Sequence, residues 1–272
     1  MRAAILQMTG GVDPAANADI LTAAVQAAAA DGATMLFTPE MSNLIDRDRE
    51  RAARAIAPEY ADPVLAEVRS AARAAGLWVH LGSLAVRRAD GRLANRAFVI
   101  DATGTIVARY DKLHLFDVDL PSGETWRESA AYAAGDCARV VATPVGALGL
   151  SICYDLRFAA LYAALSDAGA RVLAIPAAFT QPTGVAHWEV LLRARAIESA
   201  AWVIAAAQTG CHADGRTTYG HSIVVDPWGD VILDMGTVPG LDFFEIDDAR
   251  TTDVRARIPV LAHRRAIPPV ER

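Results

Sequence analysis

A buried strand, a sharp turn and a helix are predicted in succession by Val145-Gly146-Ala147-Leu148-Gly149-Leu150-Ser151-Ile152-Cys153-Tyr154-Asp155-Leu156-Arg157-Phe158. Residues 148–152 are almost all apolar or small, which is typical of a strand that is buried on both faces. Apolar side chains then recur at helical spacing, at positions 158, 161, 162 and 165. Cys153 therefore stands at the point where the strand becomes the helix.

This turn is a suitable place for a nucleophile. The unpaired N–H groups at a helix N-terminus favour a thiolate, and the amide of Tyr154 points to where an oxyanion would form. A lone cysteine in a strand is, however, more often a packing residue. The catalytic interpretation of Cys153 therefore requires partner residues elsewhere in the chain.

The composition is that of a soluble globular protein of one or two domains, with 272 residues, 53% hydrophobic and 21% charged. A net charge of −6 without a basic cluster argues against nucleic acid or an anionic membrane as partner and favours a small-molecule substrate. No stretch reaches the roughly 20 apolar residues that span a bilayer, and no signal peptide is predicted. Three cysteines without a CxxC pair indicate free thiols, so we expect a cytoplasmic protein.

A strand, an alanine-rich helix and a second strand are predicted near the N-terminus, over 2–8, 17–30 and 35–38. The second strand ends at Pro39-Glu40. Functional groups of open α/β sheets gather at such carboxyl ends. Position alone also fits a solvated turn residue or a helix cap.

The turn Asp-x-x-Gly occurs twice between predicted strands, at Asp101 and again at Asp226. Although this turn is common, its recurrence suggests two similar halves and favours one domain of two stacked sheets. Helices are also predicted over 46–57, 62–75 and 189–199, and strands over 77–84, 97–100, 105–110, 140–144, 171–175, 202–206 and 241–246.

Two long segments lack such periodicity. Residues 117–135 are polar and contain Glu124 and Glu128, and we expect them to form a loop against the functional site. Residues 255–272 are basic and contain three prolines, which predicts an extended tail that packs on its own or a neighbouring subunit.

Glu40, Lys112 and Cys153 each follow directly after a predicted strand, so one edge of the sheets can bring them together. A carboxylate can take the thiol proton and later protonate a leaving amine, while an ammonium lowers the thiol pKa and stabilises an oxyanion. This is a complete set of groups for amide cleavage.

Three alternatives are less favoured. A Cys-His hydrolase would use His114 or His221 as its base. A zinc site would use His187, His212 and His221, although no ligand-pair spacing supports it. A binding protein without turnover is compatible with any fold, but it has no reason to keep all three reactive groups.

At these residues the chain resembles the nitrilase superfamily of carbon-nitrogen hydrolases, which has a Glu-Lys-Cys site. Within it the chain is similar to the Nit branch, which includes deaminated glutathione amidase and ω-amidase. The matching segments are Phe37-Thr38-Pro39-Glu40, Tyr110-Asp111-Lys112-Leu113-His114-Leu115-Phe116-Asp117, Gly149 to Phe158, Arg127-Glu128-Ser129, Ala186 to Glu198 and Tyr219 to Gly229.

The resemblance implies a single-domain α/β fold, a four-layer α-β-β-α sandwich over 1–272, usually dimerised across the cysteine-side helices and without metal or cofactor. It implies that Glu40 is the general base, that Cys153 is the nucleophile, and that Lys112 and the Tyr154 amide stabilise the oxyanion. Glu128 would position Lys112 or the substrate, and Glu124 competes for that role.

The resemblance also bears on the substrate. Tyr154-Asp155 follows the cysteine where nitrile-hydrolysing members tend to have Trp-Glu, which favours amides over nitriles. We expect a small linear carboxylate-bearing amide, of the deaminated glutathione or α-keto acid amide type, cleaved through a thioester. Aliphatic amides and N-carbamoyl compounds are the alternatives. Arg157 and Arg195 are candidates for the substrate carboxylate, and Phe179 and Thr180 for the acyl pocket.

Overall fold

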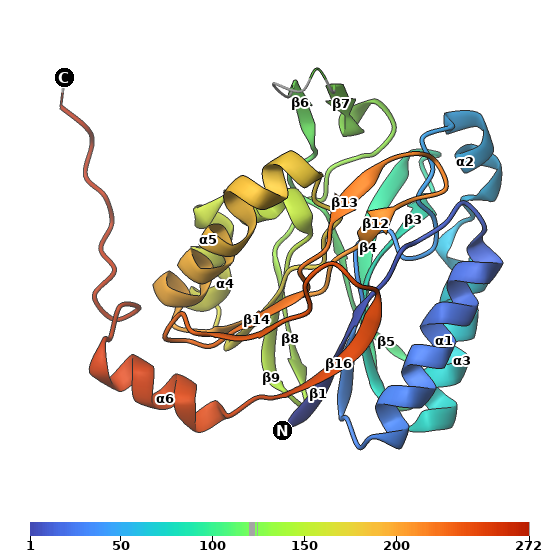
Figure 1. Ribbon diagram of the computed structural model, residues 1–272. Coiled ribbons are helices and arrows are strands. Elements are labelled where there is room, and N and C mark those ends of the chain that lie inside the picture. The colour runs from blue at the N-terminus through green and yellow to red at the C-terminus, as the bar shows by residue number, and fades with distance from the viewer. Residues whose placement is uncertain (120–122, 124, 272) are drawn as a thin grey trace.

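Two six-stranded sheets pack face to face in the computed structural model, which describes residues 1–119, 123 and 125–271 (Figure 1). The first sheet has the order β16-β1-β2-β3-β4-β5, with bounds Gly240–Glu245, Arg2–Gln7, Met35–Phe37, Trp78–Arg87, Leu93–Ile100 and Ile106–Asp111. The second has the order β15-β14-β11-β10-β9-β8, with bounds Val231–Asp234, Ile223–Val225, Trp202–Ala205, Val172–Ala174, Gly146–Leu150 and Arg139–Thr143. Buried apolar side chains of both sheets form one core cluster between them.

The two sheets have the same pattern of strand directions. Each has three parallel strands in the middle, β1-β2-β3 in one and β9-β10-β11 in the other. Each has one antiparallel strand at one edge, β16 or β8, and an antiparallel pair at the other, β4-β5 or β14-β15. The repeated Asp-x-x-Gly turn joins the strands of these two pairs. The two halves suggested by the sequence are thus seen in the strand directions, although β16 of the first sheet comes from the end of the chain.

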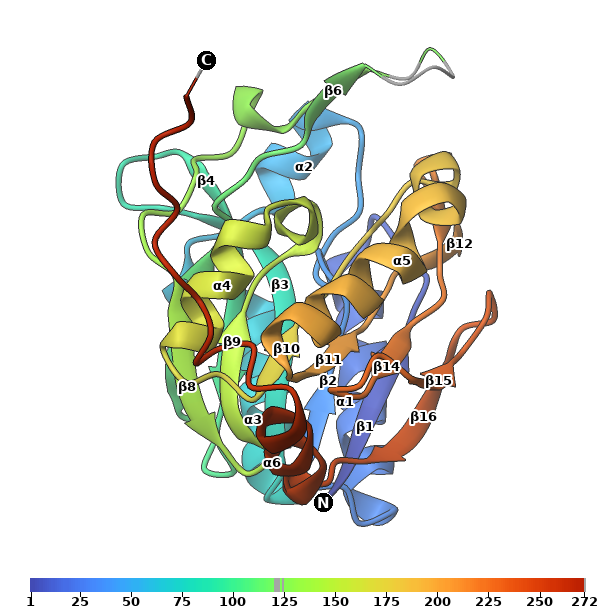
Figure 2. The same ribbon diagram turned by 90° about the vertical axis from the view of Figure 1, so that its left-hand side faces the viewer.

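Helices cover the outer faces of both sheets, so the fold is the α-β-β-α sandwich that the resemblance implied (Figures 1 and 2). One layer is formed by α1 (Pro14–Ala30) and α3 (Pro63–Ala75), and the other by α4 (Ala159–Asp167) and α5 (Gln181–Ser199). Local sequence explains the ends of α3. Asp62 accepts a hydrogen bond from the Leu65 amide at 2.8 Å, Pro63 begins the helix, and Gly76 ends it at a φ of 64°. Shorter helices are α2 (Arg49–Ala55) and η1 (Glu59–Ala61).

The structure differs from the sequence prediction in the segments around the site. Helix α5 begins at Gln181 rather than 189, because proline is tolerated in a first helical turn and Gly184 lies against Tyr219, where a Cβ atom would be 2.1 Å from the ring. Residues 117–135 are not only loop. They form the hairpin β6 (Asp117–Asp119) and β7 (Thr125–Arg127), followed by η2 (Glu128–Ala130), and a further hairpin is formed by β12 (Thr209–Cys211) and β13 (Thr217–Tyr219).

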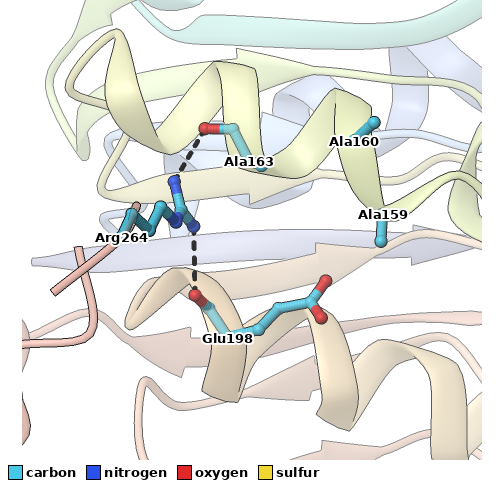
Figure 3. A pocket seen from close by; sticks show the side chains of 5 residues that line it. All are labelled: Ala159, Ala160, Ala163, Glu198 and Arg264. Carbon is cyan, nitrogen blue, oxygen red and sulfur yellow. Dashed lines mark hydrogen bonds between the residues drawn. The ribbon is translucent and has the colours of Figure 1, made fainter. Parts of the chain in front are cut away.

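The predicted tail is shorter than expected, because α6 (Asp248–Arg257) continues to Arg257. The chain beyond it passes the outer side of α4 and then extends away from the helices to the C-terminus (Figures 1 and 2). Arg264 fastens it there, donating hydrogen bonds to the carbonyls of Ala163 at 2.9 Å and Glu198 at 3.2 Å (Figure 3). Among the helices in the described part of the chain, none is long and apolar enough to cross a membrane.

One core side chain makes the stability of the fold depend on pH. His80 of β3 is buried, its Nε2 has no hydrogen-bond partner among the described residues, and burial lowers its pKa from 6.5 to about 3. The unfolded chain therefore binds one more proton than the folded chain between these two values. Stability should fall as the pH decreases through this window.

We expect the free energy of unfolding to decrease by about 1.4 kcal/mol for each pH unit between pH 6 and 4 on account of this one group. His212, whose pKa is also lowered by burial, acts in the same direction. Denaturant unfolding of the wild type and of His80→Leu at several pH values measures this. In the variant the free energy of unfolding should depend less steeply on pH, by the contribution of one proton. An unchanged dependence on pH would show that His80 is not the group responsible.

Candidate active site

The topology brings Glu40 and Lys112 to the same edge of the first sheet. Glu40 follows β2, which is parallel to β1 and β3. Because β4 is antiparallel to both β3 and β5, β5 runs in the direction of β2, and Lys112 follows directly after it. The Lys112 Nζ atom lies 2.9 Å from Glu40 Oε1.

Lys112 bridges two carboxylates. Its Nζ donates to Glu40 Oε1 at 2.9 Å, to Glu128 Oε2 at 2.9 Å and to Glu128 Oε1 at 3.2 Å. Burial by itself would lower the pKa of Lys112, but Glu128 and Glu40 outweigh it, so the pKa lies well above the ordinary value. The ammonium is thus a fixed positive charge in a buried place.

Glu128 occupies the position predicted for the second glutamate. It begins η2, directly after the β6-β7 hairpin, and its Oε2 also accepts a hydrogen bond from the Phe116 amide at 2.7 Å. Its competitor Glu124 lies outside the described residues. The β6-β7 hairpin thus brings Glu128 next to Lys112. The sequence analysis predicted only a loop over residues 117–135 and not this hairpin.

Asn95 is a site residue that sequence reasoning missed. Its Nδ2 donates to Glu40 Oε1 at 2.8 Å and to Glu128 Oε1 at 3.2 Å, and its Oδ1 is buried without a partner among the described residues. The backbone amide of Ala178 was missed as well, and donates to Glu40 Oε2 at 2.9 Å. Asparagine is uncommon within strands, so its presence in one could have indicated a functional role. The predicted strand began only at residue 97 and therefore did not include Asn95.

Gly82 allows the chain that carries Glu40 to pass close to β3. A Cβ atom at this position would lie 2.0 Å from the Thr38 carbonyl oxygen and 2.6 Å from that of Pro39. Any side chain at position 82 would therefore displace the backbone segment that precedes Glu40.

Cys153 lies at a strained turn between β9 and the helices. Its φ is 49°, a left-handed conformation that non-glycine residues adopt at a cost of about 1–3 kcal/mol, and its amide donates to the Pro176 carbonyl at 2.9 Å. The helix expected to open at Cys153 is instead the short 3₁₀-helix η3 (Cys153–Arg157), and α4 begins only at Ala159. The sharp strand-to-helix turn was predicted, and the regular helix was placed too early.

The pKa of the Cys153 thiol is raised, whereas the helix terminus and the lysine were expected to lower it. Burial and the neighbouring Glu40 raise the pKa of Cys153 well above its ordinary value, against the opposing effects of Lys112 and of the Ala178 amide. The sequence argument counted the helix terminus and the lysine but had no measure of burial. At neutral pH Cys153 is therefore a thiol that needs a base at the moment of attack.

Asp155 fastens the turn to the loop that carries Lys112. This fully buried carboxylate accepts hydrogen bonds through Oδ2 from the Ile152 amide at 2.9 Å and from Tyr110 Oη at 2.7 Å. Its Oδ1 accepts from the His114 amide at 2.9 Å and lies 2.7 Å from His114 Nδ1. Since Tyr110 and His114 flank Lys112 in the chain, one carboxylate fixes the cysteine and the lysine relative to each other.

The histidines proposed as alternative bases have other partners. His114 is held by Asp155, and His221 Nδ1 lies 3.0 Å from Asp234. Neither belongs to the described residues that line the cavity at Cys153. The Cys-His alternative thus has no geometric support.

The histidines of the zinc alternative are not brought together. His187 Nδ1 lies 3.3 Å from the Arg157 guanidinium, while His212 lies between the Gly10 carbonyl and Thr218 Oγ1, at 2.8 and 2.7 Å. Within residues 1–119, 123 and 125–271, no three His, Cys, Asp or Glu side chains are grouped as a metal site requires.

A cavity of about 570 Å³ opens beside these groups. Its lining includes the four residues predicted to contact substrate, Tyr154, Arg157, Phe179 and Thr180. Arg195 lies elsewhere, and donates from Nε to the Leu156 carbonyl at 2.9 Å and from Nη1 to Glu198 at 2.7 Å. Of the two arginines considered for a substrate carboxylate, only Arg157 reaches the cavity.

Comparison with known proteins gives consistent matches over nearly the whole chain. A family model described as carbon-nitrogen hydrolase matches residues 2–256. The deaminated glutathione amidase of Bos taurus is 41% identical over 267 residues, covering 96% of this chain and 81% of its own. That of a Synechocystis species is 40% identical over 264 residues, covering 96% and 97%. The crystal structure of the C. elegans NitFhit protein has a TM-score of 0.90 at 38% identity, covering 97% of this chain and 65% of that one.

Proposed function

Because the chain belongs to the carbon-nitrogen hydrolase family, we propose that it hydrolyses a small linear carboxylate-bearing amide through a thioester on Cys153. Family membership makes it an amidase, a hydrolase of carbon-nitrogen bonds. The observation that carries the assignment of roles is the buried Lys112, held between Glu40 and Glu128 beside the thiol.

In the acylation step Glu40 takes the Cys153 proton as the sulfur attacks the amide carbonyl. The Lys112 ammonium and the Tyr154 amide stabilise the negative oxygen of the tetrahedral intermediate. The C–N bond then breaks, Glu40 gives its proton to the leaving nitrogen, and the acyl group remains on sulfur as a thioester. Because the raised pKa of Cys153 keeps it a neutral thiol, attack and proton transfer are coupled.

Deacylation reverses these roles with water in place of the amine. Glu40 takes a proton from the water that attacks the thioester, and returns it to the sulfur as the C–S bond breaks. The products are a carboxylic acid and the free thiol. In both steps Glu128 positions Lys112 and Asn95 positions Glu40, because Lys112 donates a hydrogen bond to Glu128 and Asn95 donates one to Glu40.

The substrate assignment rests on Arg157. Its guanidinium carbon lies 5.9 Å from the Tyr154 ring centroid and 5.6 Å from that of Phe179, and it lines the cavity. No carboxylate in the described part of the chain pairs with it, so an acidic substrate can bind there. The relatives named deaminated glutathione amidase support the same class, because deaminated glutathione is an amide with a free α-keto acid carboxylate at its acyl end.

The proposed contact between Arg157 and the substrate carboxylate can be removed from either side, and both changes should lower kcat/KM by a similar factor. We expect Arg157→Met to lower kcat/KM for deaminated glutathione about 10- to 100-fold, as loss of a charge-assisted hydrogen bond does. Esterifying the substrate's α-keto acid carboxylate should cost the wild type a similar factor and the variant almost nothing. Ammonia or amine release from deaminated glutathione, α-ketoglutaramate, glutamine, an aliphatic amide and a nitrile completes the panel. A neutral amide or a nitrile as the best substrate would overturn the assignment.

We also propose that two copies associate through the α4-α5 face, as the resemblance implied. Helix α5 exposes three apolar side chains, Val185, Val190 and Ile197, at 69%, 62% and 51%. Light scattering should give twice the 28.8 kDa of one chain for the wild type, and Val190→Asp should shift it towards the monomer. A monomeric wild type would contradict the proposal.

The three free cysteines agree with a reducing compartment such as the cytoplasm.

A further inference from the structure

We infer that Gln208 is a positioning residue that holds the base Glu40 at its working distance from the Cys153 thiol, across the junction of the two sheets. The inference rests on the roles proposed above for Glu40 and Cys153. It extends them to a buried residue that is not part of the cavity lining.

The base and the nucleophile are carried by different sheets. Glu40 follows β2 of the first sheet, and Cys153 follows β9 of the second. Proton transfer between them requires hydrogen-bond reach, and a misplacement of about 1 Å can lower a rate about 100-fold. Contacts that join the two sheets beside these residues therefore bear directly on the rate.

Gln208 lies where the two sheets join. It follows β11 of the second sheet, and its backbone pairs with Met8, which follows β1 of the first. The next amide, that of Thr209, donates to the Met8 carbonyl at 2.9 Å. The Gln208 side chain is fully buried, so its amide group must find its partners inside the protein.

The side chain of Gln208 reaches the backbone of Glu40. Its Nε2 donates to the Glu40 carbonyl at 2.9 Å, and its Oε1 accepts from the Gly10 amide at 2.9 Å. A backbone N–H can only donate and a carbonyl can only accept, so these two partners determine which way the side-chain amide points. One side chain of the second sheet thus holds two connections of the first, those that follow β1 and β2.

The backbone of Gln208 is bonded to residues 176–178, which follow β10. Its amide donates to the Ala177 carbonyl at 2.8 Å. The carbonyl of the residue before Ala177 accepts from the Cys153 amide at 2.9 Å, and the amide of the residue after it donates to Glu40 Oε2 at 2.9 Å. The same short segment therefore contacts the nucleophile, the base and Gln208.

Glu40 is consequently held by the second sheet at two points. The Ala178 amide fixes its carboxylate, and Gln208 fixes its main chain. Ser83 of β3 hydrogen-bonds the residues on either side of Glu40, at 2.9 and 3.2 Å. Ser83 thus ties this segment to its own sheet, whereas Gln208 relates it to the sheet that carries Cys153.

Replacing Gln208 by methionine removes the two side-chain hydrogen bonds and leaves the backbone bond to Ala177 in place. We expect kcat for amide hydrolysis to fall about tenfold, because the base is placed less precisely. KM should change little, since Gln208 does not line the cavity. Initial rates of amine release over a range of substrate concentrations measure both values.

Gln7→Met is the matched control. Gln7 of β1 is also buried, and its Nε2 donates to the carbonyls of Gly236 at 3.0 Å and Val238 at 2.9 Å, while its Oε1 accepts from the Ser222 amide at 2.7 Å. This substitution removes no fewer hydrogen bonds than Gln208→Met does. It should lower the thermal unfolding temperature at least as much but keep the wild-type kcat.

A double-mutant cycle separates positioning from general loosening of the site. The substrate is an activated ester of the same acid, such as a nitrophenyl ester, whose leaving group needs no proton. Glu40 still assists the attack of Cys153 on this ester, and the burst of nitrophenol release at pH 7 gives the acylation rate. Gln208→Met should slow this step several-fold in the wild-type background and not at all in the Glu40→Gln background.

Gly10→Ala perturbs the same contact without removing it. A Cβ atom at Gly10 would lie 3.2 Å from Gln208 Oε1 and 3.3 Å from Nε2, so the side-chain amide must shift. This variant should slow acylation less than Gln208→Met does, and again only in the presence of Glu40. It provides the same cycle if Gln208→Met does not fold.

The outcomes separate the inference from the function on which it rests. A wild-type acylation rate, or an equal loss in both backgrounds, overturns the role of Gln208 and leaves the amidase mechanism in place. If Glu40→Gln alone hydrolyses the amide at the wild-type rate, the proposed role of Glu40 fails, and the inference fails with it.

Discussion

Replacing Cys153 by alanine is expected to lower amide hydrolysis by roughly 10⁴-fold or more while the protein remains folded, because the sulfur is the nucleophile that attacks the amide in the proposed mechanism. Cys153 lines the cavity, so loss of one atom there adds little empty volume to the packed core. Cys153→Ser should be almost as inactive, since a hydroxyl at this position is a far weaker nucleophile. Initial rates of amine release and thermal unfolding, measured on the same preparations, test both parts.

The other two cysteines provide the control. Cys137 and Cys211 are free and exposed, and neither lines the cavity. Cys137→Ala and Cys211→Ala should therefore keep the wild-type rate. Substantial turnover by Cys153→Ala would remove the nucleophile from the mechanism, and an unfolded Cys153→Ala would show that the strained turn depends on its side chain.

The sequence predicted the parts of the site that depend on local pattern. Glu40, Lys112 and Cys153 each follow a strand that hydrophobic residues mark clearly, and parallel strands bring their carboxyl ends to one edge. The two stacked sheets followed from the repeated turn. These inferences hold because they need only the order of elements along the chain.

The contacts that sequence reasoning missed all join remote segments. Asn95 lies 55 residues from Glu40, and Ala178 lies 138 residues from it. Arg264 fastens the tail to a helix 101 residues away. Spacing within one sequence carries no direct signal for such pairs, because they are set by the order of strands in a sheet and by the packing of the layers.

The thiol pKa was misjudged for a related reason. A helix terminus and a lysine can be seen in the sequence, whereas the burial that dominates the pKa of Cys153 is a property of the whole packed core. Because this pKa is raised, Glu40 must remove a proton that the surroundings do not release by themselves.

Replacing Glu40 by glutamine is therefore expected to lower kcat for the amide by roughly 10²- to 10⁴-fold, the usual contribution of a general base. The side-chain amide of the introduced glutamine also cannot make the same hydrogen bonds as the Glu40 carboxylate. Oε1 accepts from Lys112 and Asn95, and Oε2 accepts from the Ala178 amide, so the NH₂ group of glutamine faces a donor in both orientations. Glu40→Asp keeps the charge at a shorter reach and should retain more activity than Glu40→Gln.

An activated ester of the same acid separates the two steps in which Glu40 acts. Its leaving group needs no proton, so Glu40→Gln can still be acylated, but the thioester should then persist because no base activates water. Mass spectrometry should find one acyl group on Cys153, and Cys153→Ala should remain unmodified.

The pH dependence of that acylation tests the charge state of the thiol directly. Without Glu40 only the thiolate attacks. Burial is the largest cause of the raised pKa of Cys153 and remains in the variant, whereas the effect of the Glu40 charge is lost. The acylation rate of Glu40→Gln should therefore rise by up to about tenfold per pH unit between pH 7 and 9, while the wild-type rate changes much less. A flat profile in the variant would mean that Cys153 is already ionised at neutral pH, and that Glu40 acts on the water and the leaving amine but not on the thiol.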